Sequence, residues 1–139
     1  MIIAIDFDGT ICSGKYPNID GIQPCAKEII NKLYDEGHYI IIWTCRENEM
    51  LLKAVNWLLE NGIKFHRIND HNPENAAMYG GNTRKVYAHL YIDDKQVGGL
   101  PRWDEIYNEI NVMEAKYKES LSTKKLKAPH VLKHLELSM

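Results

Sequence analysis

The chain has 139 residues and a formal net charge of −2 at pH 7. This length fits one domain with a sizeable core and leaves no room for a large second domain. Apolar residues at 45% and charged residues at 26% are ordinary values for a globular protein and argue against extensive disorder. The small negative charge argues against a protein that coats nucleic acid, although it excludes no small anionic substrate.

Neither a membrane segment nor a disulfide framework is expected. No apolar run approaches the ~18 residues of a membrane span, and the chain starts on an apolar strand rather than on a basic leader. We therefore expect a cytoplasmic protein without membrane contact. The cysteines are odd in number and lack metal-ligand spacing, which indicates reduced thiols at Cys12, Cys25 and Cys45.

The first predicted strand is Ile2–Ile5, because a run of apolar, largely β-branched residues is typical of a strand covered on both faces of a parallel sheet. Asp6 and Asp8 follow it directly. Two like charges so close together repel unless a cation or a shared proton holds them. The pair is therefore either a metal site or part of a solvated loop, and residues further along the chain decide between the two.

Two amphipathic helices and a second strand are predicted next. The polar stretch Cys12–Gln23 indicates a loop or a small flap beside the acids. A helix then begins near Pro24 and ends before Gly37. The apolar run Tyr39–Trp43 predicts another strand covered on both faces, and a second helix follows over Glu47–Asn61.

The pattern repeats with weaker signals in the next part of the chain. Residues 63–68 alternate apolar and polar side chains, which predicts a strand near the edge of a sheet. Residues 69–83 predict a polar loop. Leu90–Ile92 predicts a short buried strand, and it ends in a second acidic pair, Asp93 and Asp94.

The C-terminal part is harder to interpret. A brief fifth strand at Val97–Gly99 is left open, and Asp104 is placed to cap a third amphipathic helix. We expect a single catalytic domain over residues 1–121. Residues 122–139 predict a basic tail that is solvated or bound to a partner, with Pro129 placed to begin a last short helix.

Strands separated by helices imply parallel pairing with right-handed crossovers, and hence a doubly wound, Rossmann-like α/β sheet with helices on both faces. Counting the four predicted strands along the chain, the burial pattern predicts the order 4-1-2-3, with the first strand central. Ligands in such sheets bind at the carboxyl ends of the strands, beside the point where the chain reverses direction. Four acids are expected at that point: Asp6, Asp8, Asp93 and Asp94.

Several carboxylates in one crevice repel one another, and a hard divalent cation with oxygen ligands relieves that repulsion. Mg²⁺ fits this description, and the lack of a nearby histidine and cysteine set argues against zinc. The sequence resembles the haloacid dehalogenase superfamily, in particular its small capless bacterial phosphatases. The resemblance rests on four motifs in the right order, which are Asp6–Thr10, Thr44, Lys85 and Asp93–Asp94.

The resemblance implies a Mg²⁺-dependent phosphohydrolase. It makes Asp6 the nucleophile that accepts the phosphoryl group, and Asp8 the general acid and base, whose backbone carbonyl also binds the metal. The implied catalytic residues are Asp6, Asp8, Thr44 and Lys85, the metal ligands are Asp6, Asp8, Asp93 and Asp94, and the substrate-binding residues are Gly9, Thr10, Cys45 and Arg46.

Four of these assignments have alternatives. Arg46 is placed either to reach a second anionic group of the substrate or to lie on the surface. Thr44 and Glu47 have the spacing of a capping box, which would start the following helix without any catalytic duty. Lys64 competes with Lys85 for the motif lysine. The resemblance favours Lys85, because it stands eight residues before Asp93, close to where capless members of that family place their lysine, whereas Lys64 lies inside the predicted strand at residues 63–68. Asp94 is expected to bind the metal directly, to bind it through water, or only to orient the motif.

The loops after the first motif and before the third are too short for a cap domain, so we expect an open site for a small phosphorylated metabolite, such as a sugar phosphate or a nucleotide. The oligomeric state stays open, a homo-oligomer included. The longer loop offers residues to line the entrance: Asp70, His71, Asn72, Tyr79 and Asn82.

Two other functions remain to be weighed. One is a receiver-like signalling module that would be phosphorylated on Asp70, although the order of the motifs opposes it. The other is a non-catalytic protein that keeps the metal site and binds a partner through its basic tail.

Overall fold

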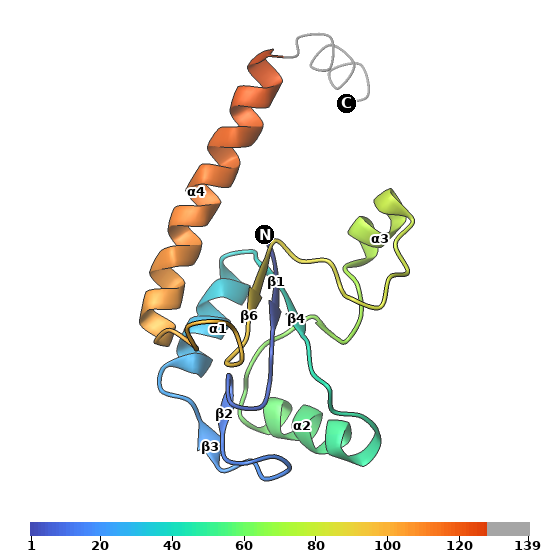
Figure 1. Ribbon diagram of the computed structural model, residues 1–139, viewed down its shortest axis with the longest axis vertical. Coiled ribbons are helices and arrows are strands. Elements are labelled where there is room, and N and C mark those ends of the chain that lie inside the picture. The colour runs from blue at the N-terminus through green and yellow to red at the C-terminus, as the bar shows by residue number, and fades with distance from the viewer. Residues whose placement is uncertain (128–139) are drawn as a thin grey trace. The chain divides into compact units, whose positions relative to one another are not determined.

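The computed structural model describes residues 1–127, which divide after Asp104 into two compact units. The first unit is built on a parallel sheet of β1 (Ile2–Ile5), β4 (Tyr39–Ile42), β5 (Arg67–Ile68) and β6 (Leu90–Ile92), in the order β5-β4-β1-β6 (Figure 1). This arrangement confirms the predicted order, in which the first strand is central and the fourth lies on its other flank.

The register of the central strands brings their carboxyl ends to one level. Ile5 on β1 pairs with Ile42 on β4 and with Ile92 on β6. One residue further on, the Asp6 N–H donates to the Ile92 carbonyl at 2.9 Å. The residues that follow β1 and β6 therefore leave the sheet side by side, as the predicted topology requires.

β1 is buried along its whole length, which explains its unbroken apolar sequence. On one face of the sheet, Ile2, Ala4 and Ile41 form a cluster with Val86 and Ala88 from the segment before β6. An irregular segment thus covers part of this face. Two helices of the first unit, α1 (Ala26–Asp35) and α2 (Asn48–Glu60), bury one stripe each, with the buried residues Ala26, Ile30 and Leu33 on α1 and Ala54 and Leu58 on α2.

The polar stretch after the first acids forms a small flap, residues Cys12–Ile22. Its two short strands, β2 (Cys12–Ser13) and β3 (Gly21–Ile22), pair in antiparallel fashion (Figure 1). The predicted strand over residues 63–68 is shorter than expected. Only its last two residues pair with β4, because Ile63 and Lys64 bond instead to α2 and α1.

The loop prediction for residues 69–83 is wrong, and the fifth strand left open at residues 97–99 does not form. The loop over residues 69–83 contains a helix, α3 (Pro73–Tyr79), because the Asn72 side chain caps its start and Gly80 ends it in the left-handed region. Residues 97–99 form a turn instead of a fifth strand. Gly98 and Gly99 adopt φ values of 89° and 80° there, which an extended strand cannot contain.

The last described helix, α4 (Trp103–Lys127), starts two residues earlier than an N-cap at Asp104 requires. Asp104 consequently lies within its first turn and is not its N-cap. The helix also runs past Leu121 into the segment predicted as a tail, whereas Pro129 lies outside the described residues. No helix in residues 1–127 is long and apolar enough to cross a membrane.

Candidate active site

Three carboxylates gather at the carboxyl edge of the sheet. Asp6 follows β1, and Asp93 and Asp94 follow β6. Each offers one oxygen atom, and these three atoms lie within 4.8 Å of one another. All three residues are partly buried, so water screens their mutual repulsion incompletely. The structure therefore brings together three of the four acids that the sequence singled out.

The electrostatics of this acidic cluster favour a bound cation or proton. Burial raises the pKa of Asp6 from 3.8 to about 7, and a hydrogen bond with Asp94 and the charges of Asp93 and Asp94 act in the same direction. A hydrogen bond from Thr10 opposes them. A donor set made only of carboxylate oxygens is what hard cations such as Mg²⁺ prefer. The residues present thus fit that metal, and we find no softer ligand among them.

Thr10 ties the two acidic segments together. Its hydroxyl donates to Asp6 Oδ2 at 2.9 Å and accepts from the Asp94 backbone N–H at 2.9 Å. The residue is fully buried, and its carbonyl accepts a hydrogen bond from the Trp103 indole N–H at 3.0 Å. Thr10 was predicted to bind substrate, and in the structure its hydroxyl is occupied by the acids themselves.

The loop after β1 passes so close to the Asp94 carboxylate that position 9 requires glycine. Its φ is 80°, and a Cβ atom at this position would overlap the carboxylate of Asp94. Both observations explain why the residue after Asp8 has no side chain. The Gly9 carbonyl accepts a hydrogen bond from Gln23 Nε2 at 3.0 Å, which holds the loop from the other side.

The side chain of Asp8 is separate from the acidic cluster and is paired with Arg46. Arg46 Nε donates to Asp8 Oδ2 at 2.8 Å, and Nη2 donates to Asp8 Oδ1 at 2.7 Å. The Arg46 side chain is 1% exposed and that of Asp8 is 26% exposed. This hydrogen bonding raises the pKa of the Arg46 guanidinium further above its ordinary value.

Thr44 is held at the carboxyl end of β4 by Asn69. The Thr44 N–H donates to Asn69 Oδ1, and Asn69 Nδ2 donates to the Thr44 carbonyl, both at 2.8 Å. The capping-box interpretation of Thr44 is wrong, because α2 starts at Asn48 and its N-cap is Glu47. The Thr44 hydroxyl instead accepts from the Arg46 N–H at 3.1 Å. Cys45, between them, has an exposed free thiol.

The two candidate lysines occupy different places. Lys64 pairs with Asp35 at the end of α1 at 2.7 Å, before β5 begins. Lys85 places its ammonium 4.6 Å from the ring centroid of Tyr91. The two lysines thus lie in different surroundings, and the choice of Lys85 as the motif lysine stays a prediction.

The residues predicted to line the entrance mostly stabilise their own loop. Asp70 accepts from Arg67 Nη1 at 2.7 Å and from the His71 N–H at 2.8 Å, and His71 Nε2 lies 2.8 Å from the Thr83 carbonyl. Asn72 caps α3. Asp70 therefore belongs to a surface ion pair rather than to the acidic cluster.

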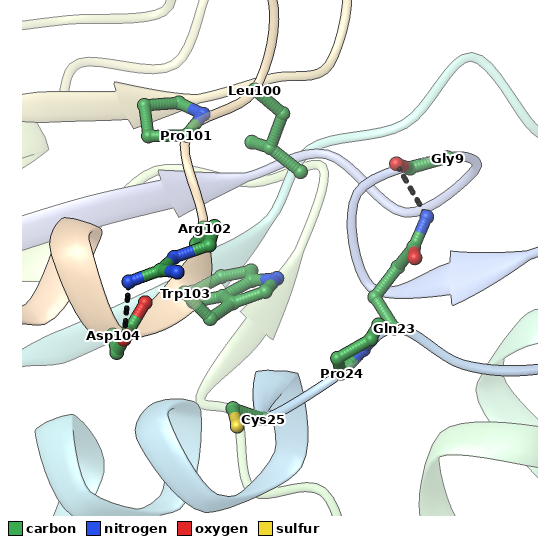
Figure 2. Close-up of a pocket in the computed structure, with 9 residues that line it drawn as sticks. All are labelled: Gly9, Gln23, Pro24, Cys25, Leu100, Pro101, Arg102, Trp103 and Asp104. Carbon is green, nitrogen blue, oxygen red and sulfur yellow. Dashed lines mark hydrogen bonds and ion pairs between the residues drawn. The ribbon is translucent and has the colours of Figure 1, made fainter.

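A cavity of about 490 Å³ lies beside the Gly9 loop (Figure 2). Its walls are mainly apolar and include the Trp103 ring, while Arg102 and Asp104 form an ion pair at 3.0 Å on its lining. The three clustered acids do not line it. The lining residues are Gly9, Gln23, Pro24, Cys25, Leu100, Pro101, Arg102, Trp103 and Asp104.

Sequence reasoning missed several residues that support the site. Asn69 adopts a φ of 51°, and its position directly after a strand was the available signal. Trp103 and Gln23 reach the loop after β1 from distant or irregular segments. No local pattern marks such contacts.

Comparisons with known proteins identify the family of this chain and a solved structure with a similar fold. A model of the haloacid dehalogenase-like hydrolases matches residues 3–113. A solved structure described as that of "the conserved protein coded by locus from Bacteroides thetaiotaomicron" is 42% identical in sequence. The match covers 81% of this chain and 91% of that chain, with a TM-score of 0.73. No curated protein matches the chain.

Proposed function

Because the chain belongs to the haloacid dehalogenase-like hydrolases, we propose that it hydrolyses small phosphate monoesters with the help of Mg²⁺. The single observation that carries this proposal is the convergence of Asp6, Asp93 and Asp94 at the carboxyl edge of the sheet. A carboxylate that is fixed beside two others and needs a cation suits a nucleophile for phosphoryl transfer.

In the proposed reaction, an oxygen of Asp6 attacks the phosphorus atom, and the bond between phosphorus and the ester oxygen breaks. Asp8 gives its proton to the departing oxygen. Water then attacks the acyl phosphate on Asp6 and loses a proton to Asp8, which releases inorganic phosphate and restores both carboxyl groups. The Thr10 hydroxyl, 2.9 Å from Asp6 Oδ2, holds the nucleophile in place.

Asp6 and Asp93, with the Asp8 backbone carbonyl, would hold a Mg²⁺ ion, and Asp94 would bind it directly, bind it through water, or only orient the motif. A bound Mg²⁺ would supply positive charge that offsets the acids and the phosphate. Thr44 and Lys85 are proposed to contact the phosphate oxygens from the neighbouring strand ends. The preference for Lys85 is supported by the pairing of Lys64 with Asp35.

The substrate class is a small phosphorylated metabolite, such as a sugar phosphate or a nucleotide, in an open site without a cap domain. The shortness of the flap, residues Cys12–Ile22, and of the loop that carries α3 supports this part of the proposal. A cytoplasmic location stays a prediction.

The test is hydrolysis of p-nitrophenyl phosphate by the whole chain. We expect turnover that requires Mg²⁺, stops with EDTA and is lost in Asp6→Asn. The matched control is Asp70→Asn, which removes an acid of the same type from a surface ion pair outside the cluster. Full activity in Asp6→Asn would rule out the assigned nucleophile. A stable acyl phosphate on Asp70 would favour the receiver-like alternative instead.

A further inference from the structure

Arg46 is a buried cation whose contacts reach three separate segments. Besides its two hydrogen bonds to Asp8, Nη2 donates to the Pro17 carbonyl and Nη1 to the Met50 carbonyl, each at 3.1 Å. These partners lie in the loop after β1, in the flap and in the first turn of α2. One side chain therefore links all three segments.

Two aromatic rings enclose the same guanidinium group. Its central carbon lies 5.3 Å from the Phe7 ring centroid and 5.0 Å from that of Tyr16. Phe7 is fully buried, while Tyr16 is an exposed residue of the flap. A planar guanidinium suits such an enclosure better than an ammonium, because it stacks on rings and still donates in its plane. The flap thus contributes both a ring and a carbonyl to hold Arg46.

The pairing with Arg46 fixes the Asp8 carboxylate and still leaves it able to contact a substrate. Each oxygen of a carboxylate has two lone pairs, and Arg46 occupies one on each oxygen. With 26% of the Asp8 side chain exposed, the remaining lone pairs can meet a substrate. A bidentate pair also sets the orientation of the carboxylate plane, which a single contact from lysine would not do.

We propose that Arg46 is a positioning residue that orients Asp8 for proton transfer and at the same time clasps the flap against the loop after β1. The first half of this inference rests on the proposed function, since it gives Asp8 the role of acid and base. The second half concerns the flap alone. This role differs from the substrate contact that the sequence predicted for Arg46.

The orientation of Asp8 is tested with two esters of similar size. Nitrophenolate departs easily without a proton, whereas phenolate is a stronger base and needs one, so only phenyl phosphate depends strongly on a well-placed acid. For Arg46→Met, we expect kcat/KM to fall at least ~100-fold with phenyl phosphate but no more than about tenfold with p-nitrophenyl phosphate. Arg46→Lys keeps the charge and should fall between Arg46→Met and the wild type.

The control variant is Arg67→Met, which removes an arginine that pairs with an aspartate at the same 2.7 Å distance outside the site. It should change neither kcat/KM value. In an Asp8→Asn background, Arg46→Lys should add no further preference between the esters. Equal losses on both esters in Arg46→Met and Arg46→Lys would overturn the positioning role.

The clasp is tested without any activity measurement, by hydrogen exchange of the whole chain. In Arg46→Met and Arg46→Lys, the amides of residues 12–22 should exchange at least ~10-fold faster than in the wild type, and those of β1 should not. Arg67→Met should leave the flap unchanged. Unaltered flap exchange in both Arg46 variants would overturn the clasp. Inactivity of the wild type on both esters would overturn the proposed function, and exchange would still decide the clasp.

Discussion

The crowding of acids around Asp6 should lower the free energy of unfolding of the metal-free protein above neutral pH. The substitution Asp6→Asn should remove this loss of stability. Burial raises the pKa of Asp6 to about 7 in the folded chain, against an ordinary value of 3.8. Between these two values the folded state holds a proton that the unfolded state has lost. The contribution of Asp6 to the free energy of unfolding therefore falls as the pH rises from about 4 to about 7.

A pKa difference of this size corresponds at most to about 4 kcal/mol. Asp6 is only partly buried, and screening by solvent reduces the expected effect to about 1–2 kcal/mol. In EDTA at pH 8, Asp6→Asn should be more stable than the wild type by this amount, and the difference should be small near pH 4. Urea unfolding at both pH values, followed by tryptophan fluorescence, measures it.

Two controls separate charge relief from other effects. Burial lowers the pKa values of His66 and His89, so their contribution to the free energy of unfolding rises with pH, opposite to that of Asp6. Both histidines are present in the wild type and in Asp6→Asn, so their contributions cancel when the two proteins are compared. Hydrogen bonds from His71 and Arg67 lower the pKa of Asp70, so Asp70→Asn should gain no stability at pH 8. Mg²⁺ should stabilise the wild type at pH 8 and not Asp6→Asn. An equal gain for Asp6→Asn at both pH values, or no gain at pH 8, would refute the reasoning.

Three further substitutions address the support of the acidic cluster. Thr10→Val leaves the Asp94 N–H and Asp6 without their hydroxyl partner and should lower the free energy of unfolding by about 1–3 kcal/mol, measured in urea. Gly9→Ala should weaken Mg²⁺ binding in calorimetry, because its Cβ atom would displace the Asp94 carboxylate. Trp103→Phe removes one indole hydrogen bond to the Thr10 carbonyl and should cost about 1 kcal/mol in the same urea assay; no change would show that this bond is dispensable.

The sheet and the location of the acids were predictable from local patterns. Unbroken apolar runs at Ile2–Ile5 and Tyr39–Ile42 have no polar face to expose, so both strands had to be internal. Once these strands were placed, the connections fixed the neighbour of β1 on its other side, and with it the meeting of Asp6 and Asp93. The alternation over residues 63–68 predicted a strand that is too long, because Ile63 is buried beside the end of a helix and not within the sheet.

The partners of individual polar side chains were not predictable in this way. Arg46 stands 38 residues from Asp8, and Trp103 stands 93 residues from Thr10. Sequence periodicity reports which face of an element is apolar, and it carries no information on which distant carboxylate an arginine meets. An arginine after a strand is as compatible with the surface as with a buried pair, and packing from other segments, including Phe7 and the flap residue Tyr16, is what buries Arg46. The acids thus follow from strand order, whereas the orientation of Asp8 depends on the packing of a loop that strand order leaves undetermined.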